Sequence, residues 1–427
     1  MESLWKNFKV LVWSLFLCTA IFGMCFPTQA GAAEPIVLGA VGPLSSIAGR
    51  DSYRAVKIAV EEINAGGGVE VGGVKRLLKV VSADTRDNAP GVPVNEAILA
   101  YEKIILKHKP AALVVNCHRS EAMLASMDLI AKYKVPTFIS ISVSPVVDKK
   151  IAEYMKKGIP TFFHTSNNVI DWARAYASLM KSFKENGLTK SYGIYSDCLA
   201  FRGLWGMVEK GLARQGIELL GVDAVPIGTT DFSASLLKAK KKKTDILWTI
   251  YETAQIGILT KQWDALRVPG LLFVMAGPFV SQTAWKEYGD SLDGVLVQFT
   301  EAGGMPLKKY PKSTEFYEKC IKKWPDWQYS YGHSPGNSYD SVYLFANAIE
   351  RAGTLDVGPL IKAIEETDRK GVTGRIKFDK HHKIIYGEDP EESAIMVFFQ
   401  WQNGKAVPVS PPPIAEGKII LPSRMKK

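Results

Sequence analysis

Short apolar runs alternate along this chain with segments in which apolar residues recur every three or four positions. Each run is almost continuously apolar, which is typical of a strand that is buried on both faces. The runs are Ile36–Val41, Leu77–Ser82, Ala111–Val115, Thr137–Ile141, Tyr192–Tyr195, Ile246–Ile250, Leu271–Met275 and Gly294–Phe299. This alternation of strand and helix predicts parallel sheets that are covered by helices on both sides.

Two of the intervening segments show helical periodicity clearly. One has its apolar face at Val56, Ala59, Val60 and Ile63, and the other at Val342, Phe345, Ala346 and Ile349. Glycines follow both segments, where helix C-caps are expected. The chain has 427 residues, of which 47% are hydrophobic and 22% charged. That length is large for one hydrophobic core and comfortable for two, so we expect an α/β protein with two parallel-sheet bodies.

The first 32 residues have the pattern of a cleaved signal peptide. A short basic lead precedes the apolar run Val10–Phe26, and small residues follow at Ala30–Ala32. The run is somewhat shorter than the roughly 20 residues that a membrane-spanning helix needs, so cleavage is favoured over a membrane anchor. Cys25 is preceded by Met24, which is bulky where lipid-attachment sites have a small residue. We therefore expect a protein that is exported to the periplasm without a lipid.

Charge and cysteine content exclude several classes of protein. The net charge of +10 is spread along the chain, and its one dense run, Lys240–Lys243, is interpreted as a solvated loop rather than a nucleic-acid surface. Cys117, Cys198 and Cys320 are odd in number and widely spaced, so they are expected to be free thiols and not a disulfide framework. No cluster of histidine, cysteine and carboxylate residues has zinc spacing, so we expect neither a metal nor another cofactor.

Several motifs in series resemble one family. In chain order they are GAVGPLSSIAG with AVEEINAGGGV, ADTRDNAPGVPVNEAI, VVNCHRSE, VPTFISISVSP, DFSASLLKAKKKKTDILW, SYDSVYLFANAIERAG and GVTGRIKFD. Together they resemble the type I periplasmic solute-binding proteins of branched-chain amino acid and amide transporters. The resemblance extends from Glu34 to about Asn403.

The resemblance implies two Rossmann-like lobes joined by a hinge that the chain crosses three times. The crossings are expected near Phe162–Ser166, Phe273–Gly277 and Ala394–Phe398. Lobe I would then hold residues 33–163 and 277–392, and lobe II residues 164–276 and 393–427. The ligand would lie between the lobes, which agrees with the general rule that ligands of open α/β sheets bind beyond the carboxyl ends of the strands.

Polar residues at the strand ends of lobe I are candidate ligand-binding residues. Ser45 and Ser46 follow the first strand and lead into a helix, so they could hold a carboxylate, or merely cap the helix. Arg119 follows the third run and could bind a carboxylate with two hydrogen bonds, or form a surface salt bridge. The family pattern adds Ser120, which matches the second serine of a pair. It also adds Ser142 and Ser144, which keep part of the family's ligand-binding capacity.

Lobe II is expected to supply aromatic residues that close over the ligand. The resemblance places Phe201 and Tyr251 there, and it places Phe279 just after the expected crossing at Gly277. Packing in the core is the alternative for each of the three. Phe279 stands where amino-acid binders of this family often carry an acid that pairs with the ligand's ammonium group. An unpaired buried ammonium is costly, although Glu252 or Asp197 could replace that acid. The sequence therefore favours an apolar or aromatic carboxylate over an ordinary α-amino acid.

Two other classes of function were considered. Gly332–Gly336 matches the G-x-S-x-G pattern of a serine hydrolase, with Ser334 as nucleophile and His381 or His382 downstream. However, the residue after the nucleophile must donate a backbone N–H to the oxyanion, and Pro335 has none. A ligand-sensing regulator of the same fold is the other alternative, but no transmembrane or signalling segment is evident after the binding fold.

The sequence thus predicts a non-enzymatic, extracytoplasmic solute-binding component of an ABC importer. It would capture a small amino-acid-like, amide or aromatic carboxylate ligand between two lobes. Its expected partners are that solute and the permease subunits in the membrane. We expect it to be a monomer with no bound nucleic acid.

Overall fold

The computed structural model describes residues 33–89, 91–251, 255–275, 277–281, 283–299, 301–327 and 335–422, so the predicted signal peptide lies outside the described residues. The first sheet has five strands in the order β4-β1-β5-β6-β7, and all of its neighbouring pairs are parallel. Its strands are β1 (Ile36–Gly42), β4 (Leu78–Asp84), β5 (Ala112–Val115), β6 (Thr137–Ile139) and β7 (Phe162–His164). A hairpin of β2 (Val69–Val71) and β3 (Val74–Arg76) lies outside this sheet.

Helices cover both faces of the first sheet. Alternate residues along each strand contribute to two separate apolar clusters, because successive side chains of a strand point to opposite faces. Helices α2 (Ile47–Ala65), α12 (Pro335–Ala352) and α13 (Val357–Glu365) cover one face. Helices α3 (Val94–His108), α4 (Ser120–Tyr133) and α5 (Pro145–Lys156) cover the other.

The second sheet has seven strands in the order β18-β17-β12-β11-β10-β8-β9. Its parallel part is β8 (Lys190–Ser196), β9 (Glu218–Val225), β10 (Ile246–Ile250), β11 (Leu271–Met275) and β12 (Leu296–Phe299). The antiparallel strands β17 (Val397–Gln402) and β18 (Lys405–Ser410) complete it at one edge. Its helices are α6 (Val169–Glu185) and α7 (Leu199–Gln215) on one face, and α8 (Ser233–Lys241) and α9 (Gln255–Ala265) on the other.

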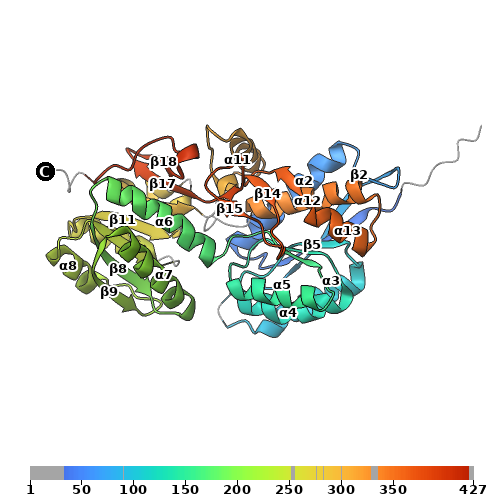
Figure 1. Ribbon diagram of the computed structural model, residues 1–427, viewed down its shortest axis with the longest axis horizontal. Coiled ribbons are helices and arrows are strands. Elements are labelled where there is room, and N and C mark those ends of the chain that lie inside the picture. The colour runs from blue at the N-terminus through green and yellow to red at the C-terminus, as the bar shows by residue number, and fades with distance from the viewer. Residues whose placement is uncertain are drawn as a thin grey trace, which may run out of the picture.

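The two sheets with their helices form two bodies side by side along the long axis of the molecule (Figure 1). The prediction of parallel sheets covered on both faces is confirmed. Shorter elements lie around them: α10 (Ala284–Tyr288), α11 (Pro311–Lys323), β13 (Asp368–Lys370), β14 (Arg375–Lys377), β15 (Tyr386–Gly387) and β16 (Ala394–Ile395), with 3₁₀ turns at Gly277–Val280, Gly289–Leu292, Ala302–Gly304 and Pro412–Ile414.

Each of the eight predicted runs coincides with or overlaps a strand, but the connections between the sheets differ from expectation at one point. The chain leaves the first sheet after β7, and after the separate pair of β15 and β16 it joins the second sheet again at β17. The remaining connection was expected at Phe273–Gly277. However, β12 pairs with β11 and β17, so this connection follows β12. Leu296 and Val297 are fully buried and pair with strands of the second sheet on both sides. Residues 296–299, which were expected in lobe I, therefore lie in the second sheet.

Candidate functional site

The carboxyl ends of β5 and β6 carry a cluster of polar residues that bond to one another. Ser120 opens helix α4, and its hydroxyl lies 2.9 Å from the hydroxyl of Ser142, which follows β6. Ser120 is partly exposed and Ser142 is buried. Because each hydroxyl can donate one hydrogen bond and accept two, the pair keeps capacity for a ligand. The structure therefore brings together two of the predicted ligand-binding residues.

Asn116 holds the strand ends beneath this pair. Its side-chain oxygen accepts hydrogen bonds from the backbone N–H groups of Ser140 (2.9 Å) and Ile141 (3.3 Å), and its amide nitrogen donates to the carbonyl of Phe138 (2.5 Å). The side chain is completely buried. Asn116 thus bridges β5 to the segment that leads to Ser142.

Replacing Asn116 with alanine should lower the free energy of unfolding by about 1–3 kcal/mol, because two buried backbone N–H groups would lose their acceptor. The measurement is the urea unfolding midpoint followed by circular dichroism. Asn186→Ala is the matched control, since its amide donates to the Ser182 carbonyl at the surface and its loss should cost about 0.5 kcal/mol or less. Equal losses in the two variants would show that Asn116 does not hold the strand ends.

Ser46 is the N-cap of α2, as the alternative interpretation proposed. Its hydroxyl accepts from the backbone N–H of Gly49 at 3.4 Å and donates to the Pro43 carbonyl at 2.8 Å. Ser45, beside it, is exposed. Ser144 is likewise an N-cap, since its hydroxyl accepts from the backbone N–H of Val146 at 3.2 Å at the start of α5. Capping uses part of the hydrogen-bonding capacity of Ser46 and Ser144, and binding of a ligand by these serines stays a prediction.

Arg119 makes surface contacts in this structure. Its Nε lies 3.9 Å from the carboxylate of Glu121, and its Nη1 donates to the carbonyl of Val92 at 3.4 Å. Its backbone N–H donates to Asp87 at 2.7 Å. Burial raises the pKa of Asp87 above its ordinary value, although hydrogen bonds from Thr85 and from the Arg119 backbone act in the opposite direction. The guanidinium group is partly exposed, and its binding of a ligand carboxylate stays a prediction.

The three aromatic residues that were predicted to bind the ligand lie in the core. Phe201, on α7, is 9% exposed and belongs to the apolar cluster beneath α6 and α7. Tyr251 is fully buried, and its hydroxyl bonds to the Pro226 carbonyl and the Gly228 N–H, each at 3.2 Å. Phe279 is also fully buried and packs edge to face on Tyr288. The packing alternative therefore describes all three in this structure, and their contact with a ligand stays a prediction.

The two acids considered for a ligand ammonium differ in what the structure shows. Asp197 forms an ion pair of 2.6 Å with Arg202, which lowers the pKa of its carboxyl group. Glu252 lies outside the described residues. Asp197 therefore already has a cation of its own chain beside it.

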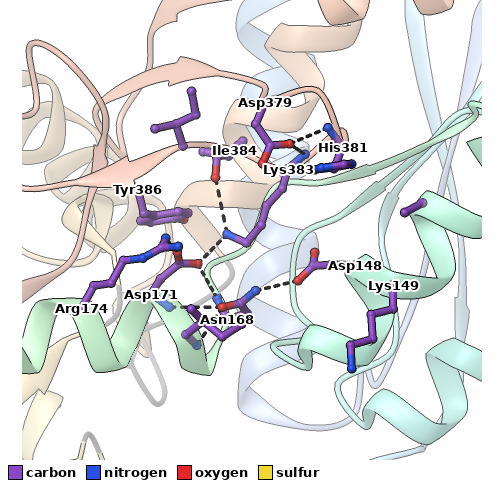
Figure 2. Close-up of a pocket in the computed structure, with 13 residues that line it drawn as sticks. Asp148, Lys149, Asn168, Asp171, Arg174, Asp379, His381, Lys383, Ile384 and Tyr386 are labelled. Atoms are coloured by element: carbon purple, nitrogen blue, oxygen red, sulfur yellow. Dashed lines mark hydrogen bonds and ion pairs between the residues drawn. The ribbon is translucent and has the colours of Figure 1, made fainter. Parts of the chain in front are cut away.

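A polar network at the connections between the sheets was not predicted. Asn168 and Asp171 form a capping box at the start of α6, in which Asn168 accepts from the Asp171 N–H and Asp171 accepts from the Asn168 N–H at 2.9 Å. Asp171 also accepts from the ammonium group of Lys383, on the segment that returns toward the second sheet (Figure 2). The signal that could have revealed part of this network is the spacing Asn168-x-x-Asp171 before an apolar run.

The same network lines a pocket of about 360 Å³ between α5, the start of α6 and residues 379–386. Figure 2 shows Asp148 on α5 facing Asn168, and the two are joined by a hydrogen bond of 2.6 Å. The pocket thus has walls from both bodies and from two of the connecting segments. None of the nine predicted ligand-binding residues lines it.

Comparison with known proteins decides the family. A model of the periplasmic binding protein family matches residues 35–405. The chain belongs to this family. The protein named Leu/Ile/Val-binding protein homolog 7 of Brucella suis biovar 1 (strain 1330) is 26% identical over 409 residues, which cover 92% of this chain and 96% of that relative.

Two solved structures share the fold of this family member. A Silicibacter pomeroyi protein described as a branched-chain amino acid ABC transporter superposes with a TM-score of 0.78 at 18% identity, covering 92% of this chain and 100% of its own. A solute-binding protein of an ABC transporter from R. palustris, solved in complex with benzoate, has a TM-score of 0.62 at 14% identity, with coverages of 92% and 99%. The prediction of a type I periplasmic binding protein fold is confirmed.

The hydrolase alternative receives no support from the family, which consists of solute-binding proteins. Residues 332–334, including the nucleophile candidate Ser334, lie outside the described residues. Pro335 is the first residue of α12, and Glu301 accepts hydrogen bonds from the next two backbone N–H groups, of Gly336 (2.7 Å) and Asn337 (3.1 Å). These two N–H groups at the helix N-terminus therefore already bind a buried carboxylate of the chain itself.

Two further findings concern only the described part of the chain. No group of three or more histidine, cysteine or acidic side chains there is arranged to hold a metal ion. No helix in those residues combines the length and the hydropathy that crossing a membrane requires. Among the same described residues, Cys117, Cys198 and Cys320 are free thiols, and the first and last are buried.

Proposed function

We propose that this protein is the periplasmic solute-binding component of an ABC importer. It captures a small carboxylate-bearing solute between the two lobes and delivers it to a permease in the membrane. The observation that carries the proposal is the Ser120–Ser142 hydroxyl pair at the carboxyl ends of β5 and β6. The proposal is supported by the family, by the fold and by the general rule that ligands of such sheets bind at these ends.

Binding needs no chemical step in this proposal. The hydroxyl groups of lobe I and the backbone N–H groups of the turn after β1 hold the polar end of the solute, and closure of lobe II excludes water. A dissociation constant on the order of micromolar corresponds to about 8 kcal/mol of binding free energy. The solute shifts the protein toward the closed form only as far as it binds that form more tightly than the open one.

The ligand class that we favour is a compact apolar or aromatic carboxylate. Asp197 is occupied by Arg202, so it is a weak candidate for a partner of a ligand ammonium group. The R. palustris structure with benzoate shows that the fold accommodates an aromatic acid. The name of the Brucella relative points instead to leucine, isoleucine and valine, which makes these amino acids the principal competitors.

A thermal-shift screen followed by calorimetry tests the proposal. Benzoate, leucine, isoleucine, valine and a short aliphatic amide are the probes, because a ligand of the native state raises its apparent stability. We expect a rise with at least one of them, and a loss of affinity of roughly 3–10-fold in Ser142→Ala, since one hydrogen bond contributes about 0.5–1.5 kcal/mol. Tight binding of leucine without binding of benzoate would contradict the ligand class, and unchanged affinity in Ser142→Ala would contradict the site.

A further inference from the structure

His164, the last residue of β7, has its imidazole ring completely buried between two oxygen atoms. Its Nε2 lies 2.8 Å from the carbonyl oxygen of Ser142, and its Nδ1 is bonded to the carboxylate of Asp148. A carbonyl oxygen can only accept a hydrogen bond, so Nε2 carries a hydrogen. The partner of Nδ1 is a carboxyl group. The second proton of the pair therefore lies either on the ring or on Asp148.

The surroundings of Asp148 favour an ionised carboxylate. Burial alone would raise its pKa, but the charges of His164 and Lys383 and the hydrogen bonds from His164 and Asn168 bring the pKa below its ordinary value. Its Oδ2 accepts from the Asn168 amide at 2.6 Å, so both carboxylate oxygens have donors. One proton is shared between Nδ1 and this carboxylate, and imidazole is the stronger base of the two groups, so each ring nitrogen of His164 carries a hydrogen.

A second histidine on the neighbouring segment has the same arrangement. The Nδ1 of His382 lies 3.0 Å from the carbonyl oxygen of Phe162, and its Nε2 lies 2.8 Å from the carboxylate of Glu365. The ring is buried, and it stacks on Phe163 with 4.2 Å between ring centroids. The partners of the His382 ring are Phe162, Glu365 and Phe163, and the residue bonds to His164 through its backbone carbonyl, so the chain itself offers a comparison for the His164 ring.

We propose that His164 is a positioning residue of the ligand site, held as an imidazolium ion that fixes the Ser142 loop to the hinge. The placement of the ligand at Ser142 rests on the proposed function, whereas the charge of the ring does not. A charge-assisted hydrogen bond to the Ser142 carbonyl sets the orientation of a residue whose hydroxyl faces Ser120. The other ring N–H holds Asp148, which is on α5.

The contacts of this ring continue into the second body. Asp148 accepts from Asn168, and Asn168 donates its backbone N–H to Asp171 of α6, which also accepts from Lys383. The charged groups around the imidazolium are therefore Asp148 on α5, Asp171 on α6 and Lys383 on the returning segment. Through this series the hydroxyl pair of lobe I is joined to the start of the first helix of lobe II. In this proposal, His164 links the orientation of Ser142 to the contacts at the hinge.

Nitrogen-15 NMR of the histidine rings tests the charge directly. The wild-type protein is labelled at histidine, and His164→Gln assigns the resonances of residue 164. We expect both ring nitrogens to carry hydrogen at pH 7.5, so that they resonate close together, as in imidazolium. In Asp148→Asn the amide N–H can donate to a neutral Nδ1, and the two nitrogens should separate. A wild-type ring with one hydrogen at pH 7.5 would overturn the proposal, whether or not a ligand has been found.

Calorimetry with benzoate and with isoleucine tests the positioning role. His164→Gln and Asp148→Asn should each weaken binding by about fivefold or more, while His382→Gln changes it by less than about twofold. All three variants should unfold at a lower temperature than the wild type, so loss of stability alone does not produce this difference. Equal losses of affinity in His164→Gln and His382→Gln would show that His164 contributes only to stability and does not position the ligand site. If neither probe binds the wild type, the proposed function fails, and the NMR result still decides the charge of His164.

Discussion

Asp171→Ala should lower the free energy of unfolding by about 3–5 kcal/mol, the largest effect that we expect from a single substitution in the hinge. The carboxylate is 3% exposed, and it accepts from Lys383, from Arg174 at 3.1 Å and from the Asn168 N–H. Its removal leaves the Lys383 ammonium group, which is 13% exposed, without its partner in the pair. The capping box of α6 is lost as well. Urea unfolding followed by tryptophan fluorescence measures the change.

A double-mutant cycle separates the ion pair from the helix cap. Asp171→Asn combined with Lys383→Met removes both charges while keeping similar shapes, and replacement of a buried pair is often close to neutral. We expect the double variant to be more stable than the sum of the two single losses predicts. Glu391→Ala is the surface control, because its pair with Lys370 is about half exposed and should contribute at most about 1 kcal/mol. Additive losses in the cycle would show that Asp171 acts only as a helix cap.

Gly49→Ala should destabilise the protein by about 1–3 kcal/mol and weaken solute binding by roughly tenfold, or about 1.4 kcal/mol. A Cβ atom at residue 49 would lie 2.2 Å from the carbonyl oxygen of Pro43 and 2.4 Å from its carbonyl carbon. These are backbone atoms, so the first turn of α2 or the turn after β1 has to move. That turn carries Ser45 and Ser46, two of the residues that are predicted to bind the solute. Urea unfolding and calorimetry with benzoate and isoleucine measure the two effects.

Gly203→Ala is the matched control for this substitution. Gly203 lies on the exposed side of α7, and a Cβ atom there would meet nothing within 4 Å. Because alanine favours a helix interior over glycine, the variant should be more stable than the wild type by about 0.5–1 kcal/mol. Replacement of glycine by alanine is thus expected to lower the free energy of unfolding at residue 49 and to raise it at residue 203. Stabilisation by Gly49→Ala would show that the turn after β1 tolerates the extra carbon atom, and its close packing would not be a requirement of the site.

Much of the fold could be predicted from the chain because its signals are local. The strands buried on both faces are apolar throughout, as Ile246–Ile250 and Leu271–Met275 show, and the structure has these two strands with the predicted bounds. Strand β9 gives a weaker signal, because its residues alternate between partly buried and exposed. It was not predicted. The wrong connection near residue 275 has a similar origin, since no local feature of residues 294–299 indicates which sheet they join.

The candidate site was predicted only in part. Serines at strand ends are visible in the sequence because the carboxyl ends of parallel strands meet at one edge, and the contact between Ser120 and Ser142 agrees with that rule. The aromatic residues could not be assigned, since Tyr251 and Phe279 look the same in sequence whether they face a ligand or a core. The hinge network was missed because its partners are far apart in the chain, as Asp171 and Lys383 are.

The order of apolar and polar residues by itself determined the class of fold, the two sheets and the edge at which polar side chains gather, because burial and periodicity are properties of neighbouring residues. Only the tertiary structure decided which sheet receives β12, which aromatic side chains fill the cores, and that His164 lies between two oxygen atoms. These outcomes depend on contacts between distant segments. Their energies arise only when the backbone brings the groups within hydrogen-bonding distance and removes them from water.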